Sequence, residues 1–199
     1  MGGGVGISLP ATYRVATEHT RLAMPETGIG LFPDVGGGWF LSRLEGRVGP
    51  FLALTGARID GAECLELGLA THYLDSDSTG EAKMRISEED PERLEGLLGT
   101  MAITPPPARI VDNLLAINRH FASDRFEDIL ASLDADDSSW AMKELATLRS
   151  KSPQTCKVAL RQLRLAKDFT DFAENMRQEY RIGSRVLLRP DFAEGVRAV

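Results

Sequence analysis

The pattern of apolar and polar residues differs between the first 75 residues and the rest of the chain. Short apolar or β-branched pieces occur early, and such pieces favour strands. The predicted strands cover residues 13–17, 20–24 and 69–75. Between them, short apolar stretches predict helices over 37–45, 49–56 and 60–68. In the last of these, Asp60 is a suitable N-cap and Gly68 a suitable stop. Short strands alternating with short helices indicate an α/β core.

From about residue 76 the chain turns polar and then helical. We expect residues 75–90 to form an exposed connection, and the prolines of 104–108 to interrupt any helix. Helices are then predicted over 125–134, over 138–151 and from Pro153 onward. Asp124 is the expected N-cap of the first of these three.

The last long helical segment, residues 169–188, carries apolar residues at about helical spacing. These are Phe172, Met176, Tyr180 and Leu187. The spacing predicts one apolar stripe that packs into the core.

Composition excludes several classes of function. The net charge of −6 and a pI near 5.2 argue against nucleic-acid binding, because no broad basic surface can form. No run of eighteen apolar residues occurs, so no membrane span is predicted. Met1 is followed by glycines rather than by a charged and then apolar leader, so we expect no secretory signal.

Cysteine and histidine usage narrows the picture further. Cys64 and Cys156 lie far apart without a pairing motif, which suits a reducing compartment. His19, His72 and His120 are scattered, and no group of residues has the spacing of a metal site. We therefore expect no metal.

Two carboxylates stand out in the stretch MPETGIGLFPDVGGGWF, residues 24–40. Glu26 and Asp34 are eight residues apart and each follows a proline directly. Gly28, Gly30 and Pro33 make one continuous helix through both unfavourable. Two separate starts fit better.

Pro25 would begin a short turn with Glu26 in its first turn, and Asp34 would cap a second helix that runs through Trp39 and Leu41. One interpretation is that both carboxylates are simple helix caps, since free N–H groups attract negative charge. The other is that both point into one cleft. There, apolar neighbours such as Phe32 would tune a base or nucleophile.

The N-terminal MGGGVGISL offers backbone without side chains in front of a helix. Such a segment lets N–H groups face a ligand oxygen. The glycine spacing matches neither a P-loop nor a dinucleotide fingerprint, and no Gly-x-Ser-x-Gly elbow supports a serine hydrolase.

Taken together, these stretches resemble the crotonase superfamily, which includes the enoyl-CoA hydratases and isomerases. The resemblance is carried by residues 2–17, 23–44, 52–75 and 191–199. A narrower resemblance, to the hydrolases that cleave 3-hydroxyisobutyryl-CoA in valine breakdown, is carried by FPDVGGGWFLSRL (32–44), 134–145 and 152–163. The resemblance implies an α/β, crotonase-like ββα spiral core that lacks its N-terminal part, followed by a C-terminal α-helical region. The implied division is 1–75 for the core, 76–107 for a connection and 108–199 for the helical region.

The resemblance also implies roles for three residues. Gly3 is expected to supply one backbone N–H of an oxyanion hole, Glu26 to be the catalytic carboxylate, and Asp34 to be a second acid beside the 3-hydroxyl of the substrate. All three would be substrate-binding, with Glu26 and Asp34 catalytic. Hydratases of the superfamily resemble the chain at Glu26 but carry a second glutamate at the position of Gly6, and usually a glycine at that of Asp34. Gly6 together with Asp34 therefore favours the hydrolases.

The implied reaction is hydrolysis of an acyl-CoA thioester, with coenzyme A as part of the substrate and no separate cofactor. Two alternatives stay open: a hydratase or isomerase acting on acyl-CoA, and a non-catalytic crotonase-like subunit. The implied location is the cytoplasm, or the mitochondrial matrix in a eukaryote, and relatives often assemble into homo-oligomers through their C-terminal helices. Because the family's core begins upstream of the triple glycine, we expect an N-terminally truncated chain with low activity.

Overall fold

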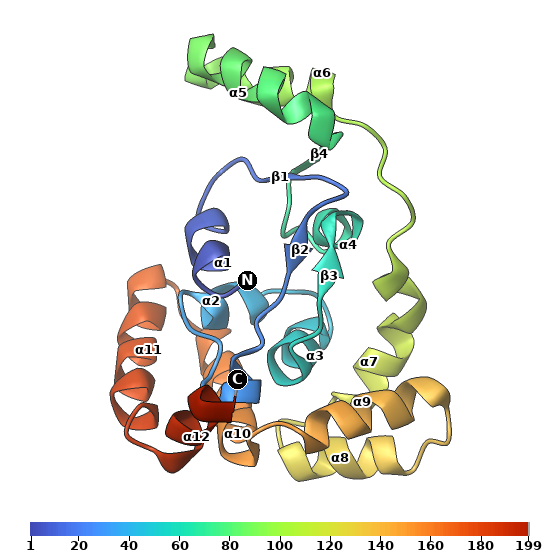
Figure 1. Ribbon diagram of the computed structural model, residues 1–199, viewed down its shortest axis with the longest axis vertical. Coiled ribbons are helices and arrows are strands. Elements are labelled where there is room, and N and C mark those ends of the chain that lie inside the picture. The colour runs from blue at the N-terminus through green and yellow to red at the C-terminus, as the bar shows by residue number, and fades with distance from the viewer. Residues whose placement is uncertain (199) are drawn as a thin grey trace. The chain divides into compact units, whose positions relative to one another are not determined.

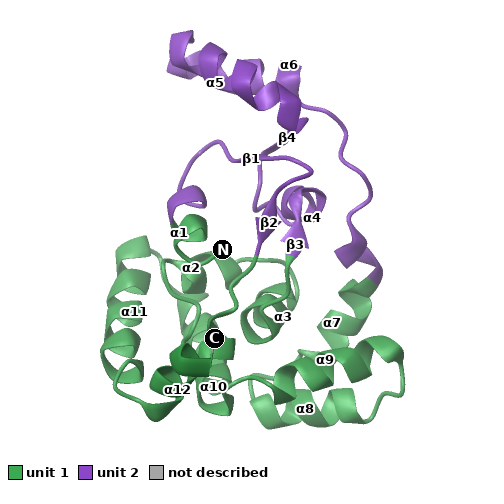
Figure 2. Cartoon of the chain, viewed as in Figure 1, with its two compact units in different colours: residues 1–6, 23–58, 113–199 green, residues 7–22, 59–112 purple. Residues whose placement is uncertain are grey.

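The computed structural model describes residues 1–198 and divides into two compact units (Figure 2). Unit 1 contains residues 1–6, residues 23–58 and the chain from residue 113 onward. Unit 2 contains residues 7–22 and 59–112. Each unit is thus assembled from segments that are distant in sequence, and each is described separately below.

The elements follow one another along the chain as labelled in Figure 1. The α-helices are α1 (Gly3–Ser8), α2 (Gly37–Leu41), α3 (Val48–Thr55), α4 (Gly61–Glu66), α5 (Thr79–Glu88), α6 (Leu94–Met101), α7 (Leu114–His120), α8 (Phe126–Asp134), α9 (Ser139–Arg149), α10 (Pro153–Ala166), α11 (Phe172–Val186) and α12 (Pro190–Ala198). The 3-10 helices are η1 (Glu26–Ile29), η2 (Ser76–Ser78), η3 (Pro91–Arg93) and η4 (Arg109–Asn113). The strands are β1 (Val15–Ala16), β2 (Arg21–Leu22), β3 (Ile59–Asp60) and β4 (His72–Tyr73).

Unit 1 is built around α3, which is apolar on all sides and buried over its whole length. A helix without a polar face is stable only when neighbours cover it, and α10 packs against both α3 and α2. The Ser152 side chain caps α10 by accepting from the backbone N–H of Thr155, and Pro153 occupies the first helical position, as the sequence predicts. Gly56 ends α3 in the left-handed conformation, with φ of 67°.

Unit 2 holds the strands. Strand β1 pairs in parallel with β4, and β2 pairs antiparallel with β3, so the described residues of this unit form two sheets of two strands each. Helix α4 begins with a capping box, in which Asp60 accepts from the N–H of Glu63 and Glu63 accepts from the N–H of Asp60. The predicted cap at Asp60 is confirmed.

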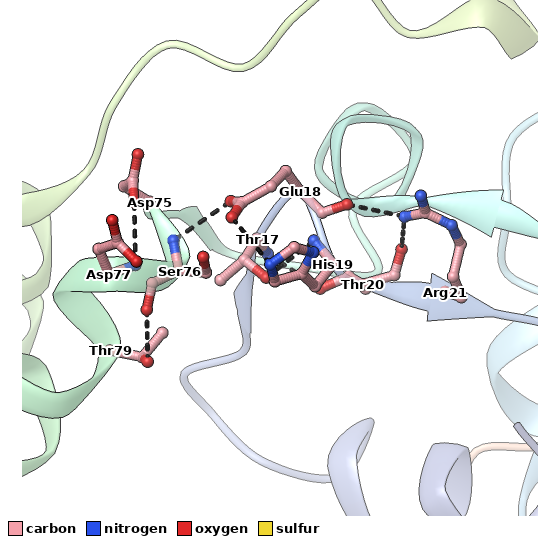
Figure 3. Close-up of polar contacts among 9 residues, drawn as sticks. All are labelled: Thr17, Glu18, His19, Thr20, Arg21, Asp75, Ser76, Asp77 and Thr79. Atoms are coloured by element: carbon pink, nitrogen blue, oxygen red, sulfur yellow. Dashed lines mark hydrogen bonds and ion pairs between the residues drawn. The ribbon is translucent and has the colours of Figure 1, made fainter.

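Polar contacts within unit 2 join the turn between β1 and β2 to the residues that follow β4 (Figure 3). The backbone N–H of Ser76 donates to the Glu18 carboxylate at 3.2 Å. The pKa of Glu18 is lowered, chiefly by a hydrogen bond from the Ser76 side chain. The Arg21 guanidinium donates to the backbone oxygens of Glu18 and Thr20. These are exposed contacts that shape a turn.

Most predicted elements are confirmed, with shorter bounds. Each predicted strand range contains an observed strand, and residues 102–108 are not helical. The segment 75–90 is exposed but is not an irregular connection, because most of it forms α5. This helix buries only Ala82, so its sequence shows no apolar stripe from which a helix could be predicted.

Two details of the helical predictions are wrong. Asp124 does not cap α8; its carboxylate pairs with Arg47 at 2.8 Å, and Arg125 is the N-cap residue. On α11, Met176, Tyr180 and Leu187 are exposed rather than in the core. The residues that α11 buries fully are Asn175, Glu179 and Val186. The apolar spacing was real, but the helix turns a largely polar face inward.

Candidate active site

Glu26 lies at the first position of η1, the 3-10 turn that follows Pro25. The turn is held on several sides within unit 1. The Thr27 hydroxyl donates to the carbonyl of Leu54 on α3 at 3.0 Å, and the N–H of Ser152 donates to the carbonyl of Thr27 at 3.0 Å. Gly30 ends the turn at φ of 69°. The predicted turn with Glu26 in its first turn is confirmed.

Helix α12 completes this support. A Cβ at Gly195 would lie 2.4 Å from the backbone of Ile29, and one at Gly30 would lie 2.4 Å from the backbone of Asp191. Only residues without side chains allow such an approach of two backbones. The C-terminal helix therefore rests directly on the turn that carries Glu26.

The Glu26 carboxyl group is buried, with 6% of the residue exposed. Its Oε2 atom has no hydrogen-bond partner among residues 1–198, and Oε1 lies 3.6 Å from the position of a Cβ at Gly2. Burial raises the pKa of Glu26 to about 7, opposed by its own backbone N–H and aided by the charge of Asp34. A carboxyl group with a pKa near neutrality can exchange protons readily at physiological pH.

Helix α1 brings glycine backbone to this carboxyl group. The N–H groups of Gly4 and Val5 donate to the carbonyls of Met1 and Gly2. The N–H of Gly3 lies in the first turn of the helix, where backbone N–H groups have no acceptor within the helix itself. Beyond its own helix, a Cβ at Gly3 or Gly4 would meet no atom of residues 1–198 within 4 Å, so packing among the described residues does not require glycine at either position.

Asp34 lies in the loop between η1 and α2 and is half-buried. Burial raises the pKa of its carboxyl group. The prediction that Asp34 caps the following helix is wrong, because α2 begins at Gly37 with Gly36 as the N-cap residue. Only the backbone carbonyl of Asp34 takes part, accepting from the N–H of Gly37 at 2.7 Å. Neither carboxylate of residues 24–40 is a helix cap through its side chain.

The residue after Asp34 links this loop to α1. Val35 has a φ of 51°, in the left-handed region that β-branched residues rarely adopt. A Cβ at Gly6 would lie 2.6 Å from the Val35 Cβ and 2.8 Å from its carbonyl oxygen. Any side chain at position 6 would therefore collide with Val35 as the loop stands.

Another buried acid close to this loop, Glu179 of α11, was not identified from the sequence. Its carboxylate accepts from the N–H of Gly36 at 2.9 Å and of Gly38 at 3.3 Å. Burial raises the pKa of Glu179, opposed by these two N–H groups and by Asn175, and Asp34 raises it further. The only sequence signal was a pair of polar residues, Asn175 and Glu179, four apart on one face of a helix.

Comparison with known proteins then places the chain. A family model described as enoyl-CoA hydratase/isomerase matches residues 1–199. The chain belongs to the enoyl-CoA hydratase/isomerase family.

Similarity to individual members of the family spans the whole chain. It is 40% identical to the mitochondrial 3-hydroxyisobutyryl-CoA hydrolases of Xenopus laevis and Homo sapiens, over 54% and 53% of their lengths. It also matches, over its full length, a carnitinyl-CoA dehydratase from Mycobacterium thermoresistibile (35% identity, TM-score 0.94, 57% of that chain) and an enoyl-CoA hydratase from Rhodobacter sphaeroides (33%, 0.81, 56%). The chain spans about half the length of the relatives that it matches.

These matches confirm the predicted fold class, a crotonase-like α/β fold with a helical C-terminal region. They do not agree on one reaction, because the family members named here are a hydrolase, a dehydratase and a hydratase. Among residues 1–198, no cluster of three or more His, Cys, Asp or Glu could hold a metal ion, and no helix has the length and apolar character of a membrane span. Cys64 and Cys156 are buried free thiols, and burial raises the pKa of each to about 12.

Proposed function

We propose that the protein hydrolyses small 3-hydroxyacyl-CoA thioesters, with 3-hydroxyisobutyryl-CoA as the substrate and 3-hydroxyisobutyrate and coenzyme A as products. The observation that carries this proposal is the buried Glu26 carboxyl group, whose pKa is about 7 and which has one oxygen without a partner among the described residues. The identity to hydrolases named for this substrate supports it. We propose this activity for the whole protein, because the chain spans only about half the length of these hydrolases.

The proposed chemistry assigns one role to each residue. The Gly3 N–H stabilises the negative charge that develops on the thioester oxygen. In one route, ionised Glu26 removes a proton from a water molecule as the water oxygen bonds to the acyl carbon. In the other, the Glu26 carboxylate itself attacks the acyl carbon to give an anhydride, which water then hydrolyses. The carbon–sulfur bond breaks, and the coenzyme A thiolate takes up a proton.

Asp34 is proposed to orient the substrate through its 3-hydroxyl group and to pass the proton to the departing thiolate. Its charge already influences Glu26, since it raises the pKa of that carboxyl group. The raised pKa of Asp34 itself supports a role in proton transfer. The open space at Gly3 and Gly4 supports the approach of a ligand oxygen to bare backbone at the start of α1.

A second candidate, hydration or dehydration of an acyl-CoA, is favoured by the names of the two structural relatives. Water addition to a double bond is expected to use a second carboxylate, at the position of Gly6. In this protein Val35 occupies the space that such a side chain would need. Hydrolysis therefore remains the first choice.

The deciding experiment measures thiol release from 3-hydroxyisobutyryl-CoA by the wild-type protein and by Glu26→Ala. We expect the substitution to lower kcat by about 10²–10⁴-fold, the contribution typical of a general base. Glu45→Ala, an exposed change in the same unit, serves as the control and should retain full turnover. Substantial hydrolysis by Glu26→Ala would refute the assignment, and double-bond hydration without thiol release would favour the second candidate.

A further inference from the structure

The N-terminus of α2 has no cap of its own. Residues 36–38 are all glycine, so the first turn carries no side chain that could accept from its backbone N–H groups. The Asp34 carbonyl accepts from one of them, that of Gly37. Glu179 accepts from the N–H groups on either side, those of Gly36 and Gly38, from a helix 143 residues further along the chain.

Glu179 is itself held in place by two buried amides. The Asn175 side chain, one turn earlier on α11, donates to Glu179 Oε1 at 2.8 Å. The Gln162 side chain of α10 donates to the Pro33 carbonyl at 2.8 Å and lies 3.4 Å from Glu179 Oε1. Exposed fractions of 5%, 0% and 1% for Glu179, Asn175 and Gln162 show that the group is shielded from water. These buried side chains therefore hydrogen-bond to both ends of the loop, to Pro33 through Gln162 and to Gly36 and Gly38 through Glu179.

The glycines allow this approach. A Cβ at Gly38 would lie 2.7 Å from both Asn175 Oδ1 and Gln162 Nε2, and one at Gly36 would lie 3.0 Å from the Phe172 ring. Helices α2 and α11 are neighbours in unit 1 (Figure 1). The glycine run thus has a structural reason that is separate from its place near Asp34.

The loop between Pro33 and Gly36 is strained. Between the two anchored ends lie Asp34 and Val35, and Val35 keeps a left-handed backbone. Such a conformation persists only when surrounding contacts enforce it. Without the anchors, Val35 would relax toward negative φ, and the direction of the neighbouring Asp34 side chain would change with it.

We propose that Glu179 is a positioning residue for Asp34: it caps α2 from α11 and thereby fixes the loop that carries Asp34. This role rests on the proposed function, in which Asp34 recognises the 3-hydroxyl group. Glu179 does not touch the reacting atoms, and Gln162 and Asn175 hold it in the orientation that the cap requires.

The first test compares Glu179→Gln with Glu174→Gln, a matched change on the same helix. The readout is the ratio of kcat/KM for 3-hydroxyisobutyryl-CoA over isobutyryl-CoA, which lacks the hydroxyl group. Because small misplacements of a binding group cost up to about 100-fold, we expect Glu179→Gln to lower this ratio about 10- to 100-fold. Glu174→Gln should leave it unchanged. A purely structural role would lower stability without changing the ratio, and that result would overturn the proposal.

The second test does not depend on activity. Hydrogen exchange of the Gly36 and Gly38 amides, followed by NMR, should be at least about tenfold faster in Glu179→Gln than in Glu174→Gln, while the α3 amides keep their wild-type rates. Unchanged exchange at both glycines, or equal acceleration throughout unit 1, would overturn the cap. If Glu179→Gln fails to fold, Gln162→Met replaces it in both tests, because it removes the donor to Pro33 and the longer contact with Glu179 while it leaves the Glu179 carboxylate in place. If the wild type cleaves neither thioester, the proposed function fails while the exchange rates still decide whether Glu179 anchors the loop.

Discussion

Two of the buried glutamates of unit 1, Glu26 and Glu179, are in opposite situations. The carboxylate of Glu179 receives hydrogen bonds from Gly36, Gly38 and Asn175 at the start of α2. The carboxyl group of Glu26, on η1, has an oxygen without any partner among the described residues. Burial raises the pKa of both. The difference lies in what compensates for burial: backbone and amide donors stabilise Glu179, whereas Glu26 stays available for chemistry.

The comparison also separates two kinds of glycine. At Gly36 and Gly38 a side chain would collide with α11, so these positions serve packing. At Gly3 and Gly4 an added Cβ would meet no other part of the described chain within 4 Å. Two glycine-rich segments that look alike in sequence therefore carry glycine for different structural reasons, and the effect of alanine substitution on stability can distinguish them.

The largest expected effect is on the pH dependence of stability through Glu26. Its pKa rises from 4.5 to about 7 on folding, so the neutral form is favoured in the folded state. The associated stability is fully present below pH 4.5 and is lost as the pH rises toward 7, about 3 kcal/mol in all. Urea unfolding should therefore show a steeper loss between pH 4.5 and 7.5 in the wild type than in Glu26→Gln. Parallel curves would mean that Glu26 is not a desolvated acid and that its contrast with Glu179 fails.

A smaller effect is expected from alanine at the two glycine sites. Gly38→Ala should lower the free energy of unfolding by about 1–3 kcal/mol, because Asn175 and Gln162 must move from their places around Glu179. Gly3→Ala should change it by less than about 0.5 kcal/mol. Thermal unfolding of both variants measures the difference. Equal losses would contradict the assignment of Gly38 to packing and Gly3 to open backbone.

The smallest effect concerns the charge that both glutamates share as a neighbour. Asp34 raises the pKa of Glu26 and of Glu179, yet burial is the leading cause in each case. Asp34→Asn should therefore lower the pKa of Glu26 from about 7 by only a fraction of a unit. The side-chain carboxyl resonance of Glu26, titrated by NMR, reports this shift. A return to 4.5 would show that repulsion, rather than desolvation, dominates at Glu26.

Much of the fold could be predicted from local sequence. Pro25 precedes the turn that carries Glu26, and Gly30 ends it. Asp60 and Glu63 form a capping box, and Ser152 is the N-cap residue of α10. Each of these signals involves residues close in sequence. A sequence pattern predicts a cap or a turn well when the residues that interact lie within one or two turns of each other.

The surroundings of Asp34 could not be predicted in the same way. Asp34 looked like a helix cap because it precedes α2, but the cap comes from Glu179, and no local rule connects positions 143 residues apart. The inward face of α11 could not be predicted for the same reason. Glu179 is buried where the N–H groups of Gly36 and Gly38 donate to it, and Asn175 is buried where its side-chain amide donates to Glu179. The resemblance supplied Gly3, Glu26 and Asp34 as candidates, and their roles remain predictions.

The close approach of α12 to η1 has a consequence for how the protein is made. The backbones of Gly195 and Ile29 are in contact, yet the two residues are 166 positions apart in the sequence. During translation the segment that bears Glu26 leaves the ribosome well before α12, so its contacts with α12 form only after that helix has emerged. Nascent chains that stall before that helix emerges would expose an unsupported turn, and chaperones would be expected to bind them at this stage.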